Sequence, residues 1–199
     1  AQKRAEALKS APRVGIESPT LVGSISLVGA RLDDLVLKQY GQTVEVNSER
    51  IQLLHPSWAP KSYFAEFGWV GGSDNPNLPG PTTIWSSDGK QLTPGQPVTL
   101  SWDNGAGLKF ERTYSLDQGY MVTVTQKVIN TGETPTALFP YGLIARSGTP
   151  DTLGFYILHE GPLGVFDGTL REYDYDDVQE TRKTEVTSNG GWIGITDKY

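Results

Sequence analysis

The 199-residue chain has no cysteine and only two histidines, His55 and His159. Without cysteine it forms no disulfide, thiolate metal site, iron–sulfur cluster or cysteine nucleophile. Zinc also lacks its usual ligand set, because the two imidazoles do not form a His-x-x-x-His pair. We therefore expect no metal ion and no cofactor.

Basic residues are scarce relative to acidic ones. The chain has 17 Lys and Arg against 23 Asp and Glu, a formal charge of −6 and an isoelectric point of about 4.9. Nucleic-acid-binding proteins carry a basic patch or stripe, and none is visible here. No apolar run approaches the roughly 18 residues of a membrane-spanning helix. We therefore expect no nucleic-acid partner and no membrane span within this sequence.

Catalytic motifs are missing as well. The sequence has no Gly-x-Ser-x-Gly elbow and no glycine-rich phosphate loop, and Ser24 and Ser26 fall in a strand pattern in which a hydroxyl usually faces water. A hydrolase or epimerase remains an alternative, with an acid–base set drawn from Glu111, His159, Glu160 and Asp167. Any acidic β-protein offers as many such groups. We therefore predict that the chain is not an enzyme and assign no catalytic residue.

Turn-forming residues are abundant: the chain has 23 glycines and 13 prolines. Between them, apolar and polar residues alternate with the period of a strand, most clearly in residues 21–39 and in the hairpin formed by residues 108–116 and 121–130. Further strands are expected within the ranges 137–145, 154–159 and 164–170, and residues 43–54 alternate again with a turn at Asn47 and Ser48. Only Asp176 to Thr184 looks helical. Many short strands with frequent turns predict an all-β sandwich or barrel.

The length suits one domain. Residues Ala1 to Ala11 are rich in Ala, Lys and Arg, with Leu8 as the only large apolar residue. From Pro12 onward the composition changes to that of the strand-like segments. We predict a flexible linker or frayed helix over residues 1–12 and one β-sandwich domain over residues 13–199.

Aromatic residues suggest a binding function. Trp58, Tyr63 and Trp69 belong to an aromatic cluster next to a Gly/Pro-rich loop, and exposed aromatic rings in a cleft bind sugars or extended ligands. Packing in the core is the alternative for such residues. A carbohydrate- or extended-ligand-binding module with these three residues in its cleft is thus a second hypothesis for the function.

Several segments resemble the large periplasmic domain of the YidC family of bacterial inner-membrane protein insertases. The most specific are YFAEFGW, SWDNGAGLKFER and GGWIGITDKY, and GSISLVGARLDDLVLKQY, LFPYGLIAR and FYILHEGPLGVFDGTLRE stand in the expected order. The resemblance runs from about Arg13 to Tyr199, and the sequences of these segments are similar to those of the alphaproteobacterial branch of the family.

The resemblance implies a fold and a role. The fold would be a twisted β-supersandwich, similar to galactose mutarotase, with a short helix near its C-terminal end. The domain would face the periplasm, with one transmembrane helix before Ala1 and another soon after the last segment. Its partners would be SecDF and SecYEG components, nascent membrane proteins and the flanking transmembrane helices. The family inserts proteins into the inner membrane with transmembrane residues that this sequence does not contain, so the domain would be an accessory interaction and scaffold module.

The resemblance also singles out the final segment, which in the family leads to the membrane region. Its glycines allow close backbone approach, and its Trp and Tyr suit a membrane interface. We predict that it couples the domain to the membrane part, although it would equally serve as the last strand of the fold. The segment consists of Gly190, Gly191, Trp192, Ile193, Gly194, Ile195, Thr196, Asp197, Lys198 and Tyr199.

Overall fold

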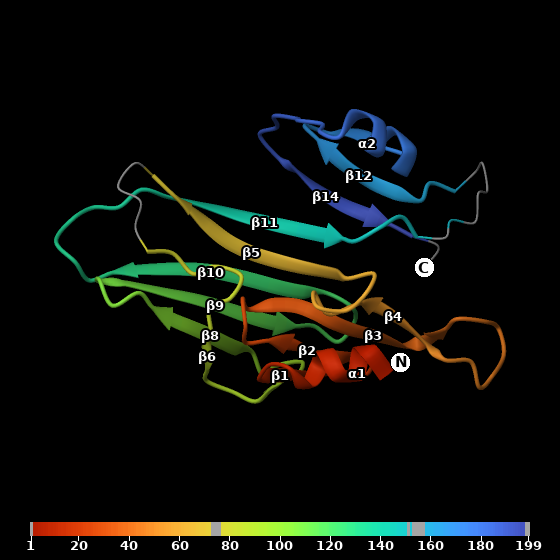
Figure 1. Ribbon diagram of the computed structural model, residues 1–199, viewed down its shortest axis with the longest axis horizontal. Coiled ribbons are helices and arrows are strands. Elements are labelled where there is room, and N and C mark those ends of the chain that lie inside the picture. The colour runs from red at the N-terminus through yellow and green to blue at the C-terminus, as the bar shows by residue number, and fades with distance from the viewer. Residues whose placement is uncertain (1, 73–76, 151, 153–157, 198–199) are drawn as a thin grey trace. The chain divides into compact units, whose positions relative to one another are not determined.

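The computed structural model (Figure 1) describes residues 2–72, 77–150, 152 and 158–197, with side chains from Arg4 onward. The chain divides into two compact units, Ala1–Ser147 and Gly148–Tyr199. Strands dominate both units, so the prediction of an all-β protein is confirmed. Neither helix in the described ranges has the length and apolar character needed to cross a bilayer.

The first unit contains a seven-stranded sheet in the order β11-β5-β3-β2-β1-β7, with β4 paired to β3 beside this path. Neighbouring strands are antiparallel except for the parallel pair β1 and β7. The strands are β1 (Arg13–Glu17), β2 (Leu21–Ser26), β3 (Arg31–Gly41), β4 (Arg50–Leu54), β5 (Tyr63–Gly71), β7 (Gln91–Leu92) and β11 (Leu138–Arg146).

A second, four-stranded sheet in the same unit has the order β10-β9-β8-β6. It consists of β6 (Ser86–Ser87), β8 (Val98–Asp103), β9 (Leu108–Leu116) and β10 (Val122–Asn130). Every second residue of β9 is buried, as the alternation in the sequence predicts for a strand with one face on the core. β9 and β10 form the predicted long hairpin, with Leu116 opposite Val122 and Leu108 opposite Asn130.

The two sheets share one hydrophobic core, which makes this unit a sandwich. Buried residues of β1 and β2, such as Ile16 and Ile25, belong to the same cluster as Leu100 and Phe110 of the second sheet. The Trp69 ring lies 5.0 Å from the Phe110 ring, measured between centroids. Aromatic contacts at this distance add to the free energy gained by burying apolar surface.

A buried arginine also joins the two sheets. Arg112 of β9 is 1% exposed and donates hydrogen bonds to the carbonyl oxygens of Ala30, at 2.8 Å, and Phe67. Its guanidinium lies 4.8 Å from the centroid of the Trp85 ring. The Tyr114 hydroxyl donates a second hydrogen bond to the Ala30 carbonyl, also at 2.8 Å. These contacts provide the buried guanidinium with the hydrogen bonds that it would otherwise make to water.

The N-terminal residues are helical from Gln2 to Lys9, which form α1. Ala7 of this helix is buried, and Arg4 forms an ion pair with Asp34 of β3. Part of the predicted linker therefore packs on the sandwich, and the flexibility of residues 1–12 stays a prediction.

Of the two alternating stretches expected around the turn at Asn47 and Ser48, only the second is a strand. Residues 50–54 form β4, but residues 43–49 form bends and turns in which Val44 and Val46 are fully exposed. Their alternation resembles a strand, yet no neighbouring strand pairs with them, and an unpaired strand is not stable in water.

The second unit contains a three-stranded sheet in the order β13-β12-β14, with the strands β12 (Gly161–Phe166), β13 (Thr169–Glu172) and β14 (Gly191–Thr196). The expected strand over 164–170 is instead a hairpin that turns at Asp167 and Gly168, both with positive φ. Such a two-residue Asp-Gly turn matches the twist of paired strands. The helix predicted over 176–184 is confirmed as α2 (Tyr175–Thr181). The expected strand over 154–159 falls mostly outside the described residues.

Candidate functional site

The predicted coupling segment consists mainly of β14, and the structure describes it as far as Asp197. β14 pairs antiparallel with β12, from Thr196 opposite Gly161 to Gly191 opposite Phe166. Because β12 is the central strand, β14 is an edge strand of this sheet. Residues 191–196 are therefore the last strand, and their coupling role stays a prediction. Lys198 and Tyr199 lie outside the described residues.

Two consecutive glycines at the start of β14 have very different surroundings. A Cβ atom on Gly191 would lie 1.8 Å from the carbonyl oxygen of Val165, and the φ angle of Gly191 is 144°. A Cβ atom on Gly190 would have no atom within 4 Å apart from those of residues 189–191. The pairing of β14 with β12 therefore requires glycine at position 191, whereas position 190 has room for a side chain.

Asp167 links the β12–β13 turn to the residues that lead into β14. Its backbone N–H donates to the Ser188 hydroxyl and to the Gly190 carbonyl, both at 3.0 Å. Its carboxylate accepts a hydrogen bond from the backbone N–H of Asn189 at 2.9 Å. Asp167, a candidate acid in the hydrolase hypothesis, thus has a structural role: it fixes the start of the coupling segment.

One apolar row crosses all three strands of this sheet. The register places Trp192 of β14 opposite Val165 of β12, and Val165 opposite Leu170 of β13. Trp192 is 54% exposed and Leu170 is 52% exposed. Ile193 is 59% exposed and lies on the other face, because successive side chains of a strand alternate. The sheet therefore presents large apolar side chains to solvent on both faces.

The three aromatic candidates for a ligand cleft have different environments. Trp58 is 53% exposed, whereas Tyr63 is half-buried, with the Arg146 guanidinium 4.8 Å from its ring centroid. Trp69 is only 7% exposed and belongs to the core cluster. The prediction that Trp69 lines a cleft is therefore wrong: its ring fills the space between the two sheets beside Phe110. Binding through Trp58 and Tyr63 stays a prediction.

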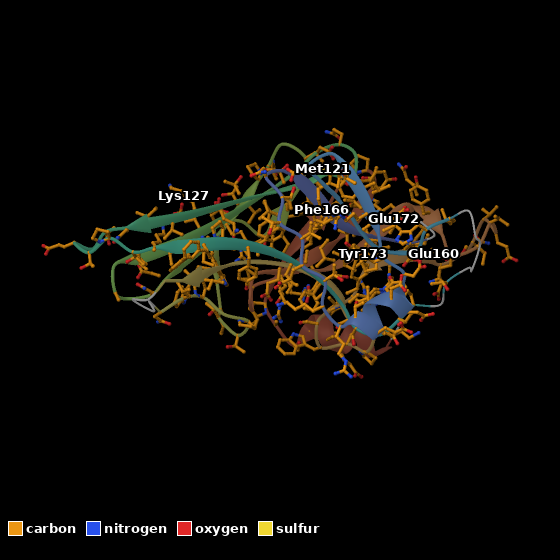
Figure 2. The ribbon with its side chains drawn as sticks, turned by 90° about the horizontal axis from the view of Figure 1, so that it is seen from above. Met121, Lys127, Glu160, Phe166, Glu172 and Tyr173 are labelled. Carbon is orange, nitrogen blue, oxygen red and sulfur yellow. The ribbon has the colours of Figure 1, made fainter. Side chains whose placement is uncertain are left out.

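The candidate acids and the candidate base are divided between the two units. Glu111 belongs to the first unit, where it forms ion pairs with Lys109 at 2.8 Å and with Lys127, which extends from β10, at 3.4 Å (Figure 2). The hydrogen bond from Lys109 lowers the pKa of Glu111, which favours a carboxylate rather than a proton donor.

The remaining candidates belong to the second unit. His159 Nδ1 lies 3.6 Å from the Asp174 carboxylate, and Glu160 is buried. Among the described residues, no group of three or more His, Asp and Glu side chains has the arrangement needed to hold a metal ion.

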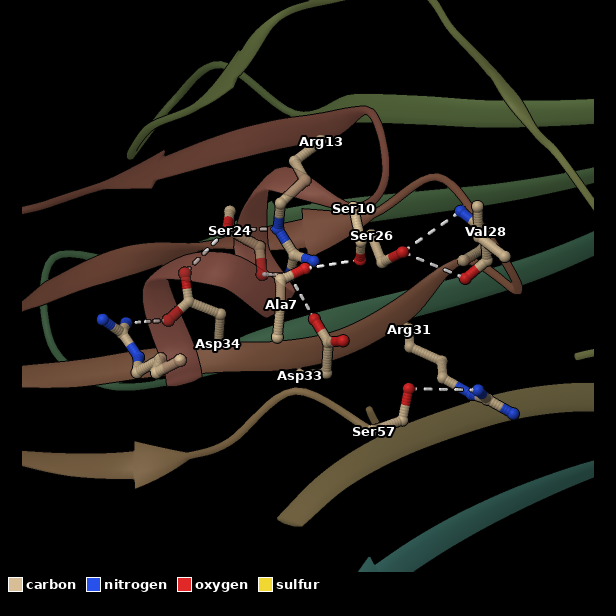
Figure 3. A network of polar contacts seen from close by, with 12 residues as sticks. Ala7, Ser10, Arg13, Ser24, Ser26, Val28, Arg31, Asp33, Asp34 and Ser57 are labelled. Atoms are coloured by element: carbon tan, nitrogen blue, oxygen red, sulfur yellow. Dashed lines mark hydrogen bonds and ion pairs between the residues drawn. The ribbon is translucent and has the colours of Figure 1, made fainter. Parts of the chain in front are cut away.

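A buried polar network near α1 was not predicted (Figure 3). Arg13 forms an ion pair with Asp33, which is fully buried, and donates from Nε to the Ser24 hydroxyl at 2.7 Å. Ser24 in turn donates to Asp34 at 2.7 Å. Burial raises the pKa of Asp33, and the nearby charge of Arg13 opposes this effect. Ser24 and the nearby, buried Ser26 therefore do not face water as expected.

The adjacent aspartates were the available signal for this network. Asp33 and Asp34 interrupt an apolar strand, and two consecutive side chains of a strand point to opposite faces. At least one of them therefore has to lie on a face covered by other parts of the fold, where a carboxylate needs a cationic partner.

Comparison with known proteins identifies relatives along the whole folded region. The family described as the YidC periplasmic domain matches residues 13–199. The protein named Membrane protein insertase YidC of Methylorubrum extorquens (strain PA1) is 49% identical over 208 residues, which cover 98% of this chain and 33% of the relative. Proteins of the same name from Bradyrhizobium diazoefficiens and Dinoroseobacter shibae are each 46% identical, over 98% and 99% of this chain and over 32% and 34% of the relatives. The chain thus spans about a third of the length of the curated relatives it matches.

Proposed function

The chain belongs to the YidC periplasmic domain family, and on this premise we propose that it acts as an accessory, non-catalytic interaction module of a membrane protein insertase. The relatives that contain a similar domain within a longer protein are named membrane protein insertases. In this proposal the domain faces the periplasm at the inner membrane. Its partners are nascent membrane proteins, SecDF and SecYEG components, and the transmembrane helices of its own full-length protein.

Residues 1–12 would connect the sandwich to a preceding transmembrane helix. The ion pair between Arg4 of α1 and Asp34 of β3 supports a contact of this connection with the first sheet. Asp34 is only 4% exposed while the Arg4 side chain is 24% exposed, so screening by salt reaches the pair from the arginine side only.

The segment 190–199 would couple the domain to the membrane part. The observation that carries this proposal is the contrast between two adjacent residues: Gly191 allows β14 to pair closely with β12, while Trp192, the next residue, is largely exposed. Such a strand is held firmly by one edge and still presents an aromatic side chain to a neighbouring surface. Tryptophan is well suited to interfaces because its large ring is apolar and its N–H group is a hydrogen-bond donor.

The test uses the full-length insertase and measures insertion of a substrate membrane protein by protease protection. The variant combines Gly191→Val with Trp192→Ala. The matched control combines Gly190→Val, where space is free, with Val178→Ala, which removes a partly exposed apolar side chain of α2. We expect a several-fold slower insertion for the variant and near-normal insertion for the control. Equal rates for the two, or a loss that follows a lower melting temperature of the whole domain, would contradict the proposal.

A further inference from the structure

The net negative charge of the chain is concentrated in its C-terminal unit. Residues 148–199 contain ten acidic and four basic residues, which accounts for the whole formal charge of −6, so residues 1–147 are formally neutral. The acidic residues of the unit are Asp151, Glu160, Asp167, Glu172, Asp174, Asp176, Asp177, Glu180, Glu185 and Asp197.

Half of these acidic residues follow one another from the end of β13 through α2, and all five are exposed: Glu172, Asp174, Asp176, Asp177 and Glu180. No residue of α2 is buried. The Asp174 side chain does not cap the helix. The exposed carboxylates of α2 therefore remain available to a cationic surface.

This acidic segment begins beside the apolar row that crosses the sheet. Glu172, labelled in Figure 2, stands two residues after Leu170 on β13 and so lies on the same face of the sheet. Both Leu170 and Trp192 are more than half exposed. An apolar centre with a charged rim is the usual composition of a protein interface, and Trp is among the residues that contribute most to binding energy there.

The net charge of the C-terminal unit indicates which kind of surface can cover the apolar row. Anionic headgroups of a bilayer repel a unit with a net charge of −6, and such surfaces attract basic segments instead. A second copy of the chain would bring an equally acidic surface to the contact, and like charges across an interface are strongly unfavourable. A basic protein surface gains attraction at the rim and burial of apolar area at the centre.

We propose that the face of the C-terminal sheet with Trp192, Val165 and Leu170, bordered by Glu172 and followed along the chain by the carboxylates of α2, docks onto a basic surface of a partner protein. The proposal rests on the proposed function in one respect, since the partner is sought among the proteins of the membrane in which the insertase works. It adds the chemistry of the contact: electrostatic attraction at the rim, and apolar packing against the row.

The experiment places a photo-reactive benzoylphenylalanine at Leu170 of the full-length insertase in native membranes. The matched position is Thr123 of β10, an exposed residue on an edge strand of the formally neutral unit. Crosslinked products are identified by mass spectrometry down to the peptide. We expect position 170 to give a protein product whose crosslinked peptide has an excess of Lys and Arg, and position 123 to give little of it.

Charge dependence is tested in the same membranes. The variant Asp176→Asn, Asp177→Asn and Glu180→Gln removes three charges from α2. The control Glu45→Gln, Glu49→Gln and Glu133→Gln removes three exposed charges from the first unit. We expect the α2 variant to lower the crosslink yield several-fold, the control to leave it unchanged, and raised salt to act like the α2 variant.

Four outcomes would overturn the proposal: a lipid adduct alone, a crosslink to a second copy of the chain, a protein product whose yield is indifferent to the α2 charges, or no product from a folded insertase. The insertion assay is a separate readout. Slow insertion with Gly191→Val and Trp192→Ala alongside a charge-independent crosslink would refute this inference and leave the proposed function standing. A charge-dependent crosslink with normal insertion would do the reverse.

Discussion

Replacing Gly191 by valine should separate β14 from β12. The new Cβ would lie 1.8 Å from the Val165 carbonyl oxygen, whereas ordinary contact begins at 3.4 Å. The two strands therefore have to move apart by about 1.6 Å at this point. A backbone hydrogen bond stretched by that amount exceeds the useful range of about 2.7–3.2 Å and is lost.

The free-energy cost follows from this geometry. Each lost backbone hydrogen bond costs about 1 kcal/mol. A β-branched residue held at a φ of 144° adds about 1–3 kcal/mol of strain. The sum is a cost of about 2–4 kcal/mol for the pairing of β14, a strand of six residues. The sheet has three strands, which is close to the minimum number for independent stability. The strand should therefore open locally.

The stability of the core of the first unit should not change in the Gly191→Val variant. All buried residues of the described hydrophobic cluster fall between Val14 and Leu116. We therefore expect the main thermal transition to remain within a degree or two, because that cluster provides the apolar burial that dominates stability.

Hydrogen–deuterium exchange read by mass spectrometry separates these effects. Peptides that cover β12 and β14 should exchange much faster in Gly191→Val, while peptides of β9 serve as the internal reference. Gly190→Val is the matched control and should keep its protection, because apart from residues 189–191 no atom lies within 4 Å of its Cβ position. Equal loss of protection in the two variants, or unchanged protection in both, would refute the steric argument.

Three further variants test other features. Arg112→Met removes the buried donor to the Ala30 and Phe67 carbonyls, and it should reduce the free energy of unfolding by about 3 kcal/mol and lower the melting temperature by about 10 °C. The surface control Lys127→Met should change the melting temperature little. Similar shifts in both variants would show that Arg112 does not join the sheets. Asp33→Asn tests the raised pKa of Asp33. Because the folded state of the wild type holds this proton more tightly than the unfolded state, the stability of the wild type relative to the variant should fall as pH rises from about 4. Urea unfolding at several pH values measures this difference, and a rise with pH would have the wrong sign. Asp167→Ala should expose the backbone of residues 188–191 to hydrogen exchange, because the Asn189 N–H loses its acceptor. Asp167→Asn keeps a side-chain oxygen and tolerates positive φ, so it should preserve the protection. Equal exchange in the two variants would argue against a role of Asp167 in fixing residues 188–191.

The strands with one buried face were predictable from the sequence. β9 alternates over nine residues and β10 over its first seven, because one side of each strand faces the core, and the local sequence alone shows this pattern. Residues 43–49 alternate in the same way but have no partner strand. Pairing depends on segments that are distant in the sequence, so local pattern alone did not separate the two cases.

Whether an individual side chain of the candidate site is buried or exposed was harder to predict. Trp58 and Trp69 stand in the same aromatic cluster, yet the first is exposed and the second fills the core. The difference arises from Phe110 and Arg112, which β9 brings against Trp69 from far along the chain. The close contact at Gly191 was similarly invisible, because it depends on the carbonyl of Val165 in another strand.

The pairing of β5 with β11 has a consequence for the order of folding. All strands from β6 to β10 lie between these two partners in the chain, so the seven-stranded sheet can be completed only after the four-stranded sheet has been synthesised. Until then β5, whose sequence YFAEFGWVG includes four aromatic residues, has an unpaired edge toward β11. Unpaired apolar edges are prone to aggregation. Newly made chains should therefore be most vulnerable in the interval before residues 138–146 arrive, and a chaperone that covers β5 during that interval would raise the yield of folded protein.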